Sequence, residues 1–338
     1  MDYSRRSLIQ TVALAGFGSV VTKVAAMDVE TFRGLGLDKR FPADQLVNGR
    51  TNMELIDALN TAEDAQYHPC AEAYPGVEVP SGSYQQFDSW SQTRIYPSTY
   101  RDIGVYLPAQ TDKSPLNLIV FNDGLGYADP NGPVRATSVL DTLIHQNEIP
   151  PTAAVFVMPG RLASGSAPSD PTQVSRADMN QRSDEYDRLT PDYGAFLQQE
   201  LLPYIEQSLS VRFASDPGRR AICGISSGGI CAFNTAWHYP EHFGHVISHC
   251  GSFVNIQGGH NYPYLVRSTP RKPIRVFLTS GKRDGNIILG NWPLANQQMA
   301  SALEYAGYEH RFEFGEGGHN LRHGGALFAE TLRWVWGS

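Results

Sequence analysis

Residues 221–230 have the sequence AICGISSGGI, the most informative segment of the chain. Its apolar run, 221–223, is typical of a strand that is buried on both faces of a parallel sheet. The run leads directly into GISSG at 224–228, a Gly-x-Ser-x-Gly pattern, and a helical stretch begins at Gly229. A strand, a sharp glycine-flanked turn with a serine at its tip and a helix form the nucleophile elbow of the α/β-hydrolase fold. The sequence therefore predicts that Ser226 is the nucleophile of a serine hydrolase.

The elbow and a second turn, at 122–126, predict an oxyanion hole, which needs two backbone N–H donors. We expect the first donor to be Ser227, because the helix that begins there directs free N–H groups and its positive end toward the developing negative charge. We expect the second donor to be Leu125, in the turn NDGLG at 122–126 that follows an apolar run.

A serine hydroxyl needs a general base and an acid that orients the base. On this fold the three residues follow in the order serine, acid, histidine. Asp284 follows the apolar run that ends at Leu278, and His319 follows the predicted last strand, residues 311–314. We therefore expect Asp284 to orient His319, and His319 to activate Ser226.

Other residues could fill these two roles. His323 is a second candidate for the base, but it lies farther from the end of the strand. Glu316 is a second candidate for the acid, but it is too close to His319 in sequence. His249 and His260 follow the strand after the nucleophile, which is not where the base occurs on this fold. We interpret these four as surface or supporting polar residues.

One segment rich in histidine could suggest a metal site. Its candidate ligands are His238, Glu241, His242, His245 and His249. Pro240 and Gly244 interrupt any helix through the segment, so these side chains need not share a face. We therefore predict no metal and no cofactor.

From about residue 83, short apolar runs alternate with helical patterns. The runs are 117–121, 153–157, 221–223, 246–247 and 274–278, and the helical patterns are 134–145, 193–209, 293–305 and 327–336. This alternation is typical of a doubly wound, mostly parallel sheet flanked by helices. The segment 100–107 alternates apolar and polar residues and predicts an early strand that could be antiparallel. In such sheets the active site lies beyond the carboxyl ends of the strands.

The composition is that of a globular protein. The chain has 338 residues, of which 41% are hydrophobic and 18% charged, and this length suits one α/β domain. The formal net charge of −7 argues against a nucleic-acid partner, because binding phosphate needs a basic surface. We assign the catalytic domain to residues 83–338, and residues 27–82 to an extension without an assigned role.

The first 26 residues resemble a signal peptide of the twin-arginine type. Arg5 and Arg6 precede a mildly apolar stretch, 8–21, and Val24-Ala25-Ala26 provides small residues for cleavage. The stretch is short and interrupted by polar residues, so it could hardly span a bilayer. An ordinary amphipathic first helix is the alternative. We expect a periplasmic or secreted protein with no membrane partner, and the sequence leaves its oligomeric state open.

The four cysteines are Cys70, Cys223, Cys231 and Cys250. They have no zinc-site spacing and are too few for a disulfide scaffold. Cys223 and Cys250 could lie near each other at the ends of adjacent strands. Twin-arginine substrates typically fold before export, in a reducing compartment, so we favour free buried thiols.

Several motifs resemble the group of α/β-hydrolase esterases that includes enterochelin esterases and feruloyl and acetylxylan esterases. The resemblance covers about residue 91 to the carboxyl end. It rests on the segments 120–124 (VFNDG), 182–187 (RSDEYD), 224–229 (GISSGG), 290–292 (GNW) and 317–320 (GGHN). One departure is the turn at 122–124, which is Asn-Asp-Gly where many hydrolases have a histidine-glycine turn.

The resemblance implies a metal-free acyl-enzyme mechanism on a small-molecule or glycan ester. It matches Ser226, Asp284 and His319 to the triad, and it places Arg182 and Glu185 near the cleft in a substrate-binding or supporting role. The expected function is an exported esterase that acts on carbohydrate-linked or phenolic esters. The alternative is a siderophore (enterochelin-type) or sugar-lactone hydrolase. A binding protein on a hydrolase scaffold is disfavoured, because no triad residue is missing.

Overall fold

The computed structural model describes residues 46–47, 49–51, 62–109, 115–165 and 174–337. The chain divides into two units, residues 1–39 and 40–338, and every described residue belongs to the second unit. The predicted signal segment therefore lies outside the described residues. None of the helices within the described part is both long enough and apolar enough to cross a membrane.

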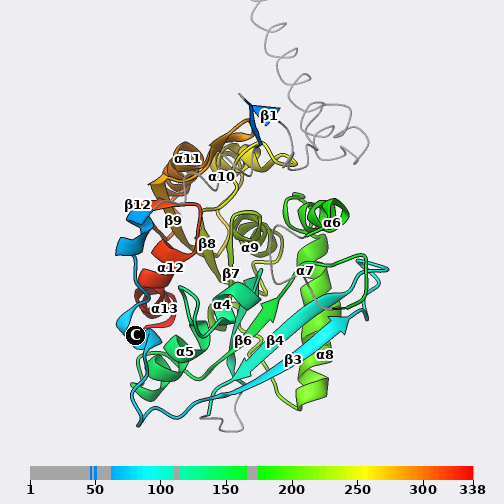
Figure 1. Ribbon diagram of the computed structural model, residues 1–338, viewed down its shortest axis with the longest axis vertical. Helices are drawn as coiled ribbons and strands as arrows, with labels where there is room; N and C mark the ends of the chain where they lie inside the picture. Colours follow the sequence, from blue (N-terminus) through cyan, green and yellow to red (C-terminus); the bar gives the residue numbers. More distant parts are fainter. Residues whose placement is uncertain (1–45, 48, 52–61, 110–114, 166–173, 338) are drawn as a thin grey trace, which may run out of the picture. The chain divides into compact units, whose positions relative to one another are not determined.

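An eight-stranded sheet forms the centre of the second unit, with the order β12-β9-β8-β7-β5-β6-β4-β3 (Figure 1). The strands are β3 Ser83–Trp90, β4 Arg101–Leu107, β5 Asn117–Asn122, β6 Thr152–Val157, β7 Arg220–Ile225, β8 His245–His249, β9 Arg275–Arg283 and β12 His310–Gly318. The pairings from β12 to β6 are parallel, whereas β4 pairs antiparallel with both β6 and β3. The predicted α/β fold with a mostly parallel sheet is confirmed, and 100–107 is indeed the antiparallel early strand.

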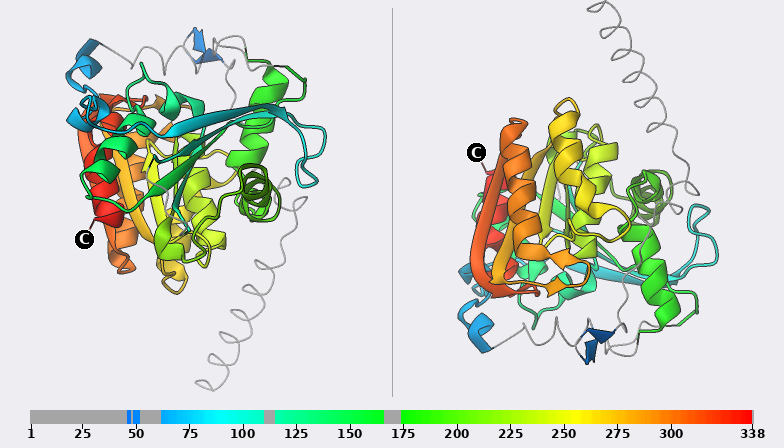
Figure 2. Two further views of the ribbon diagram at one scale, coloured as in Figure 1. Left: turned by 90° about the horizontal axis from the view of Figure 1, so that it is seen from below. Right: turned by 90° about the horizontal axis from the view of Figure 1, so that it is seen from above.

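The sheet is covered on both faces, which is why its central strands are continuous apolar runs. In β5, Leu118 and Val120 pack into one core together with α7, α9, α10 and α11. Ile119 and Phe121 point the other way, into a second core with α5 and α13. Successive side chains of a strand point to opposite faces, so both sets must be apolar. Figure 2 shows helices on both sides of the sheet.

The helices follow the expected alternation. They are α4 Leu125–Ala128, α5 Ala136–His145, α6 Arg176–Tyr186, α7 Asp192–Phe196, α8 Leu202–Leu209, α9 Ser227–His238, α10 Tyr262–Ser268, α11 Trp292–Tyr305, α12 Arg322–Ala326 and α13 Phe328–Trp336. The predicted helix 193–209 is α7 and α8 joined by a π-helical turn, Leu197–Leu201. Helix α6 was not predicted, because its sequence RADMNQRSDEY has almost no apolar residues from which a helical period could be recognised.

Shorter elements complete the unit. Two antiparallel pairs join β1 Leu46–Val47 with β2 Arg50–Thr51, and β10 Asn286–Ile287 with β11 Gly290–Asn291. Short helical turns are η1 Ala62–Gln66, η2 Ala71–Ala73, η5 Pro217–Arg219 and η6 Gly259–Asn261.

All four cysteines are free, as predicted, but they are not equally buried. Cys223, Cys231 and Cys250 are buried, whereas Cys70 is half-buried.

Candidate active site

Ser226 lies in a strained turn between β7 and α9. Its backbone has φ 58° and ψ −122°, a conformation that non-glycine residues rarely adopt. Its N–H donates to the carbonyl of His249 at the end of β8, over 2.9 Å. The turn is tight: a Cβ at Gly224 would lie 2.3 Å from the carbonyl oxygen of Gly228, so only glycine fits there. The local sequence therefore raises the Ser226 side chain above the end of the sheet.

The structure brings Ser226, Asp284 and His319 together. The Ser226 hydroxyl oxygen lies 2.8 Å from Nε2 of His319, and Nδ1 of His319 lies 2.5 Å from Oδ1 of Asp284. The three residues follow β7, β9 and β12. Because Gly318 pairs with Arg283 in the parallel register of β12 and β9, His319 and Asp284 leave the sheet side by side.

The Asp284 carboxylate is buried and well bonded. It accepts hydrogen bonds from the Ser280 hydroxyl (2.8 Å) and the Gly285 N–H (2.7 Å). Burial alone would raise the pKa of Asp284, but the charge and hydrogen bond of His319 and the other donors lower it below its usual value. An ionised Asp284 accepts a hydrogen bond from the Nδ1–H of His319, which leaves Nε2 as the acceptor for the Ser226 hydroxyl.

Two further residues, Ser252 and Trp292, continue this hydrogen-bond chain on the other side of Ser226. The two serine oxygens lie 3.2 Å apart, and the indole N–H of Trp292 donates to the Ser252 oxygen over 3.2 Å. Since Ser226 donates its proton to His319, the Ser252 hydroxyl must be the donor to Ser226. The Trp292 ring also packs edge-on against the His319 ring, at 5.6 Å between centroids.

The two predicted oxyanion donors both begin helices. Ser227 is the first residue of α9 and Leu125 the first residue of α4, so their N–H groups have no partner within the helix. Asn122, the last residue of β5, contacts the start of α9: its side-chain amide donates to the carbonyl of Gly228 (2.9 Å) and accepts from the Tyr193 hydroxyl (2.9 Å). The role of the Ser227 and Leu125 N–H groups in stabilising an oxyanion stays a prediction.

Arg182, on α6, holds the turn that follows β5. Its guanidinium forms two hydrogen bonds to the Asp123 carboxylate, of 2.9 and 2.7 Å, and both side chains are partly exposed. Asp123 has a positive φ of 53° and directly precedes Gly124, the N-cap of α4. Contact between Arg182 and a substrate stays a prediction, since the structure establishes only this supporting contact.

Glu185 is a buried partner of Arg101, which fits the supporting role expected for it, and its contact with substrate stays a prediction. Both side chains are fully buried, and the guanidinium forms hydrogen bonds of 2.8 and 3.1 Å to the carboxylate. The side-chain amide of Gln181 (2.9 Å) and the Gly160 N–H (3.3 Å) also donate to it. A buried arginine requires a counter-charge, and Glu185 supplies it. The partner is 84 residues away in sequence, so no local pattern could reveal the pair.

The comparisons with known proteins give the family of this chain and agree with its fold. A family model described as "Putative esterase" matches residues 97–335. The chain belongs to this esterase family. Its curated relatives include an iron(III) enterobactin esterase of Escherichia coli, 26% identical over 237 residues that make up 68% of this chain and 53% of the relative. The chain spans between 34% and 57% of the lengths of such relatives.

Solved structures of similar proteins share the α/β-hydrolase fold of this family member. A ferric enterobactin esterase from Salmonella typhimurium has a TM-score of 0.59 at 20% identity, covering 79% of this chain and 61% of that one. A ferulic acid esterase from Anaeromyces mucronatus, solved in complex with ferulic acid, has a TM-score of 0.54 at 14% identity, covering 78% and 94% of the two chains.

Three of the alternative residues have side chains that contact residues other than Ser226. The buried His323 ring packs against Tyr67, with 4.7 Å between centroids. The His249 ring is buried beside the Tyr127 hydroxyl, 3.0 Å from Nδ1, and desolvation lowers the pKa of His249 to about 3. Glu316 pairs with exposed Lys282 at 2.6 Å. Each of these three side chains therefore has a partner other than Ser226.

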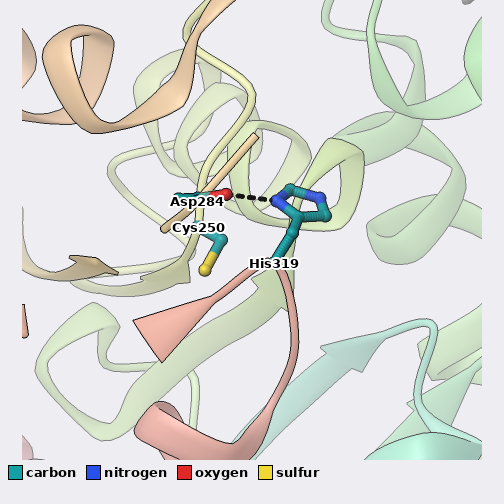
Figure 3. Close-up of side chains that lie close together, drawn as sticks. All are labelled: Cys250, Asp284 and His319. Carbon is teal, nitrogen blue, oxygen red and sulfur yellow. Dashed lines mark hydrogen bonds and ion pairs between the residues drawn. The ribbon is translucent and has the colours of Figure 1, made fainter. Parts of the chain in front are cut away.

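Among the described residues, the group of side chains that could hold a cation includes the proposed acid–base pair itself. Cys250, Asp284 and His319 each offer one ligand atom within 4.8 Å of the others (Figure 3). Asp284 and His319 already share a hydrogen bond, and burial, followed by the nearby Asp284, raises the pKa of the Cys250 thiol. Zinc-type ligation needs a thiolate. Within the described residues, the segment 238–249 forms no such cluster.

Sequence reasoning missed Ser252 as a partner of Ser226. It noted Trp292 within the GNW motif but assigned it no role. A signal was available, because a donor-only indole in a family motif must find an acceptor when it is buried. Which acceptor it finds depends on the path of the chain between β8 and α11.

Proposed function

We propose that this family member is an exported serine esterase in which Ser226 is the nucleophile, His319 the general base and Asp284 the residue that orients the base. The observation that carries the proposal is the continuous hydrogen-bond chain from the Ser226 hydroxyl through both nitrogens of His319 to the buried Asp284 carboxylate. That arrangement meets the geometric requirement for nucleophilic catalysis, in which nucleophile, base and orienting acid lie within hydrogen-bond reach.

The chemistry follows from these contacts. The Ser226 oxygen attacks the ester carbonyl while Nε2 of His319 takes the hydroxyl proton, and Asp284 stabilises the resulting imidazolium. The N–H groups of Ser227 and Leu125 donate to the negative oxygen of the tetrahedral intermediate. His319 then gives its proton to the leaving alcohol, which leaves an acyl-enzyme. Water, activated by the same nitrogen, releases the acid and regenerates Ser226.

We propose carbohydrate-linked or phenolic carboxylic esters as substrates. The support is the structural likeness to ferulic acid esterases, whose named acid is a phenolic acid. The second candidate is a siderophore or sugar-lactone hydrolase. It is favoured by the curated relatives, which are named as esterases of iron(III) enterobactin or iron(III) salmochelin.

Labelling with a fluorophosphonate tests the mechanism. The protein should be labelled on Ser226, and Ser226→Ala should lose both the label and the hydrolysis of p-nitrophenyl acetate. Retained labelling in Ser226→Ala would place the nucleophile elsewhere. Comparing kcat/KM on acetyl, feruloyl, lactone and catecholate esters then decides between the two substrate classes.

The export part of the proposal rests on residues 1–26. Arg5 and Arg6, followed by a mildly apolar stretch and by Val24-Ala25-Ala26, predict cleavage near Ala26. Amino-terminal sequencing of protein from its native host should find a start near Met27. Cytoplasmic protein that retains Met1 would contradict export and would leave the proposed catalysis untouched.

A further inference from the structure

A short turn of the amino-terminal extension contacts the loop that carries His319. This turn, η1, lies before residue 97, where the match to the esterase family begins. It packs against β12 and α12, although about 250 residues separate them in the chain. Figure 1 shows the first described helical turns beside the carboxyl-terminal elements.

Asp64, in the middle of this turn, bonds to both neighbours of His319. Its Oδ1 accepts from the Gly318 N–H over 2.9 Å, and its Oδ2 accepts from the Asn320 side-chain amide over 2.8 Å. Asp64 is only 2% exposed, so both hydrogen bonds are shielded from water. The carboxylate thus holds the backbone immediately before His319 and the side chain immediately after it.

The same carboxylate also contacts the acid side of the site. A guanidinium nitrogen of Arg283 lies 3.5 Å from Oδ1 of Asp64. Arg283 is the residue before Asp284, just as Gly318 is the residue before His319. One buried carboxylate therefore touches the chain neighbours of both members of the proposed acid–base pair.

Tyr67, the residue directly after this turn, adds two contacts. Its hydroxyl accepts from the Glu316 N–H over 2.8 Å, and its ring packs against His323. Its own N–H donates to the carbonyl of Asp64 over 3.0 Å, which links the two residues. The loop from 316 to 323 is thus held on both sides of His319.

The carboxyl end of β12, which leads into His319, is rich in glycine. Residues 315–318 are Gly-Glu-Gly-Gly, and the pairing of β12 with β9 shifts register between Gly315 and Gly318. Contacts from outside the strand therefore help to fix the backbone at His319. A catalytic group that moves by about 1 Å can lose about a hundredfold in rate.

We propose that Asp64 is a positioning residue that holds the Gly318–Asn320 loop so that His319 spans Asp284 and Ser226. This role rests on the proposed function. It assigns one described turn of the extension, Ala62–Gln66, to the support of the active site.

The test compares Asp64→Ala and Asp64→Asn with wild type, using p-nitrophenyl acetate hydrolysis and the rate of fluorophosphonate labelling. Asp64→Ala should lower kcat and the labelling rate about 10- to 100-fold, while KM changes by less than about twofold. Asp64→Asn keeps an acceptor for Gly318 but turns an N–H₂ group toward Asn320, so it should show an intermediate loss.

The exchange variant Asp64→Asn/Asn320→Asp provides the rescue. It reverses donor and acceptor between positions 64 and 320 and retains an acceptor for the Gly318 N–H. It should recover most of the kcat that Asp64→Asn loses, and an exchange variant slower than Asp64→Asn would overturn the proposal. The rescue also keeps the test decisive if Asp64→Ala fails to fold.

Asp141→Ala is the matched control. Asp141 likewise accepts one backbone N–H, from Gly82 (2.8 Å), and one side-chain donor, the Tyr106 hydroxyl (2.6 Å), but it contacts none of the proposed catalytic residues. It should lower Tm and leave kcat unchanged. Wild-type kcat in a folded Asp64→Ala would overturn the positioning role, whereas an unlabelled, inactive wild type would overturn the proposed function itself.

Discussion

At the scale of single residues, the site depends on which group donates and which accepts. An ionised Asp284 sets the tautomer of His319, and that tautomer in turn sets the direction of the Ser226 hydroxyl. The Ser252 hydroxyl and the indole N–H of Trp292 extend the same chain without carrying charge. The proposed mechanism therefore predicts a large loss of kcat from changes at Asp284, the charged end of this hydrogen-bond chain. It predicts a small loss from changes at Ser252 and Trp292, the neutral end.

Asp284→Asn should lower kcat about ten-thousandfold, equivalent to about 5.5 kcal/mol, with little change in KM. The amide keeps the shape of the side chain but would donate to Nδ1, which presents the wrong tautomer to Ser226. Glu316→Gln, whose carboxylate pairs with exposed Lys282, should change kcat less than about tenfold. Steady-state kinetics of both variants on p-nitrophenyl acetate checks this, and the reverse ranking would mean that the acid is misassigned.

Ser252→Ala should lower kcat about tenfold, about 1.4 kcal/mol, because Ser226 loses its donor and the Trp292 indole loses its acceptor. Trp292→Phe removes only the outer donor and should cost less. Since both changes interrupt one chain, the double variant should lose less than the two single losses combined. Additive losses in kcat would show that the chain does not act as a unit.

At the scale of elements, buried polar pairs fix how the helices sit on the sheet. Helix α6 has almost no apolar face, yet Glu185 ties it to Arg101 on β4, and Arg182 ties it to the turn after β5. This polar helix is therefore held by specific hydrogen bonds. Its Arg182 side chain supports the turn that contains the predicted oxyanion donor Leu125.

Glu185→Gln should destabilise the fold by about 3–5 kcal/mol, because it leaves the Arg101 guanidinium buried without its counter-charge. The double replacement Arg101→Met/Glu185→Leu should recover much of that free energy. Urea unfolding measures both variants. If Glu185→Gln has wild-type stability but an elevated KM, Glu185 contacts substrate and is more than the counter-charge of Arg101.

At the scale of the whole molecule, the dependence of stability on pH reports on buried aspartates whose pKa values are shifted in opposite directions. The pKa of Asp284 is lowered in the folded state. Its contribution to the free energy of unfolding is therefore present above the pKa of an unfolded aspartate and is lost as the pH falls through the folded pKa. Burial raises the pKa of Asp187 to about 6, despite the hydroxyl of Ser183 at 2.6 Å. The folded state is therefore most stable, as far as Asp187 is concerned, when this carboxyl group is protonated.

Asp187→Asn should stabilise the protein at neutral pH and remove one component of its pH dependence. An unfolded aspartate titrates at about 3.9. Wild type therefore loses stability, relative to this variant, as the pH rises from about 4 through about 6, where folded Asp187 ionises. Urea unfolding of both proteins at several pH values gives this difference. A difference that stays constant with pH would contradict the raised pKa.

The sequence by itself determined the alternation of the apolar strands with the helices other than α6, and the positions of Ser226, Asp284 and His319 at strand ends. These depend on local patterns, because a strand buried on both faces must be apolar throughout and an elbow serine needs small neighbours. Only the tertiary structure decided that Glu185 pairs with Arg101, that Ser252 reaches Ser226, and that Asp64 bonds on both sides of His319. Each of these is a contact between polar groups far apart in sequence, and it forms where folding leaves a buried donor beside an acceptor. Local periodicity carries no information about such partners, so they emerge only once the sheet has placed its strand ends side by side.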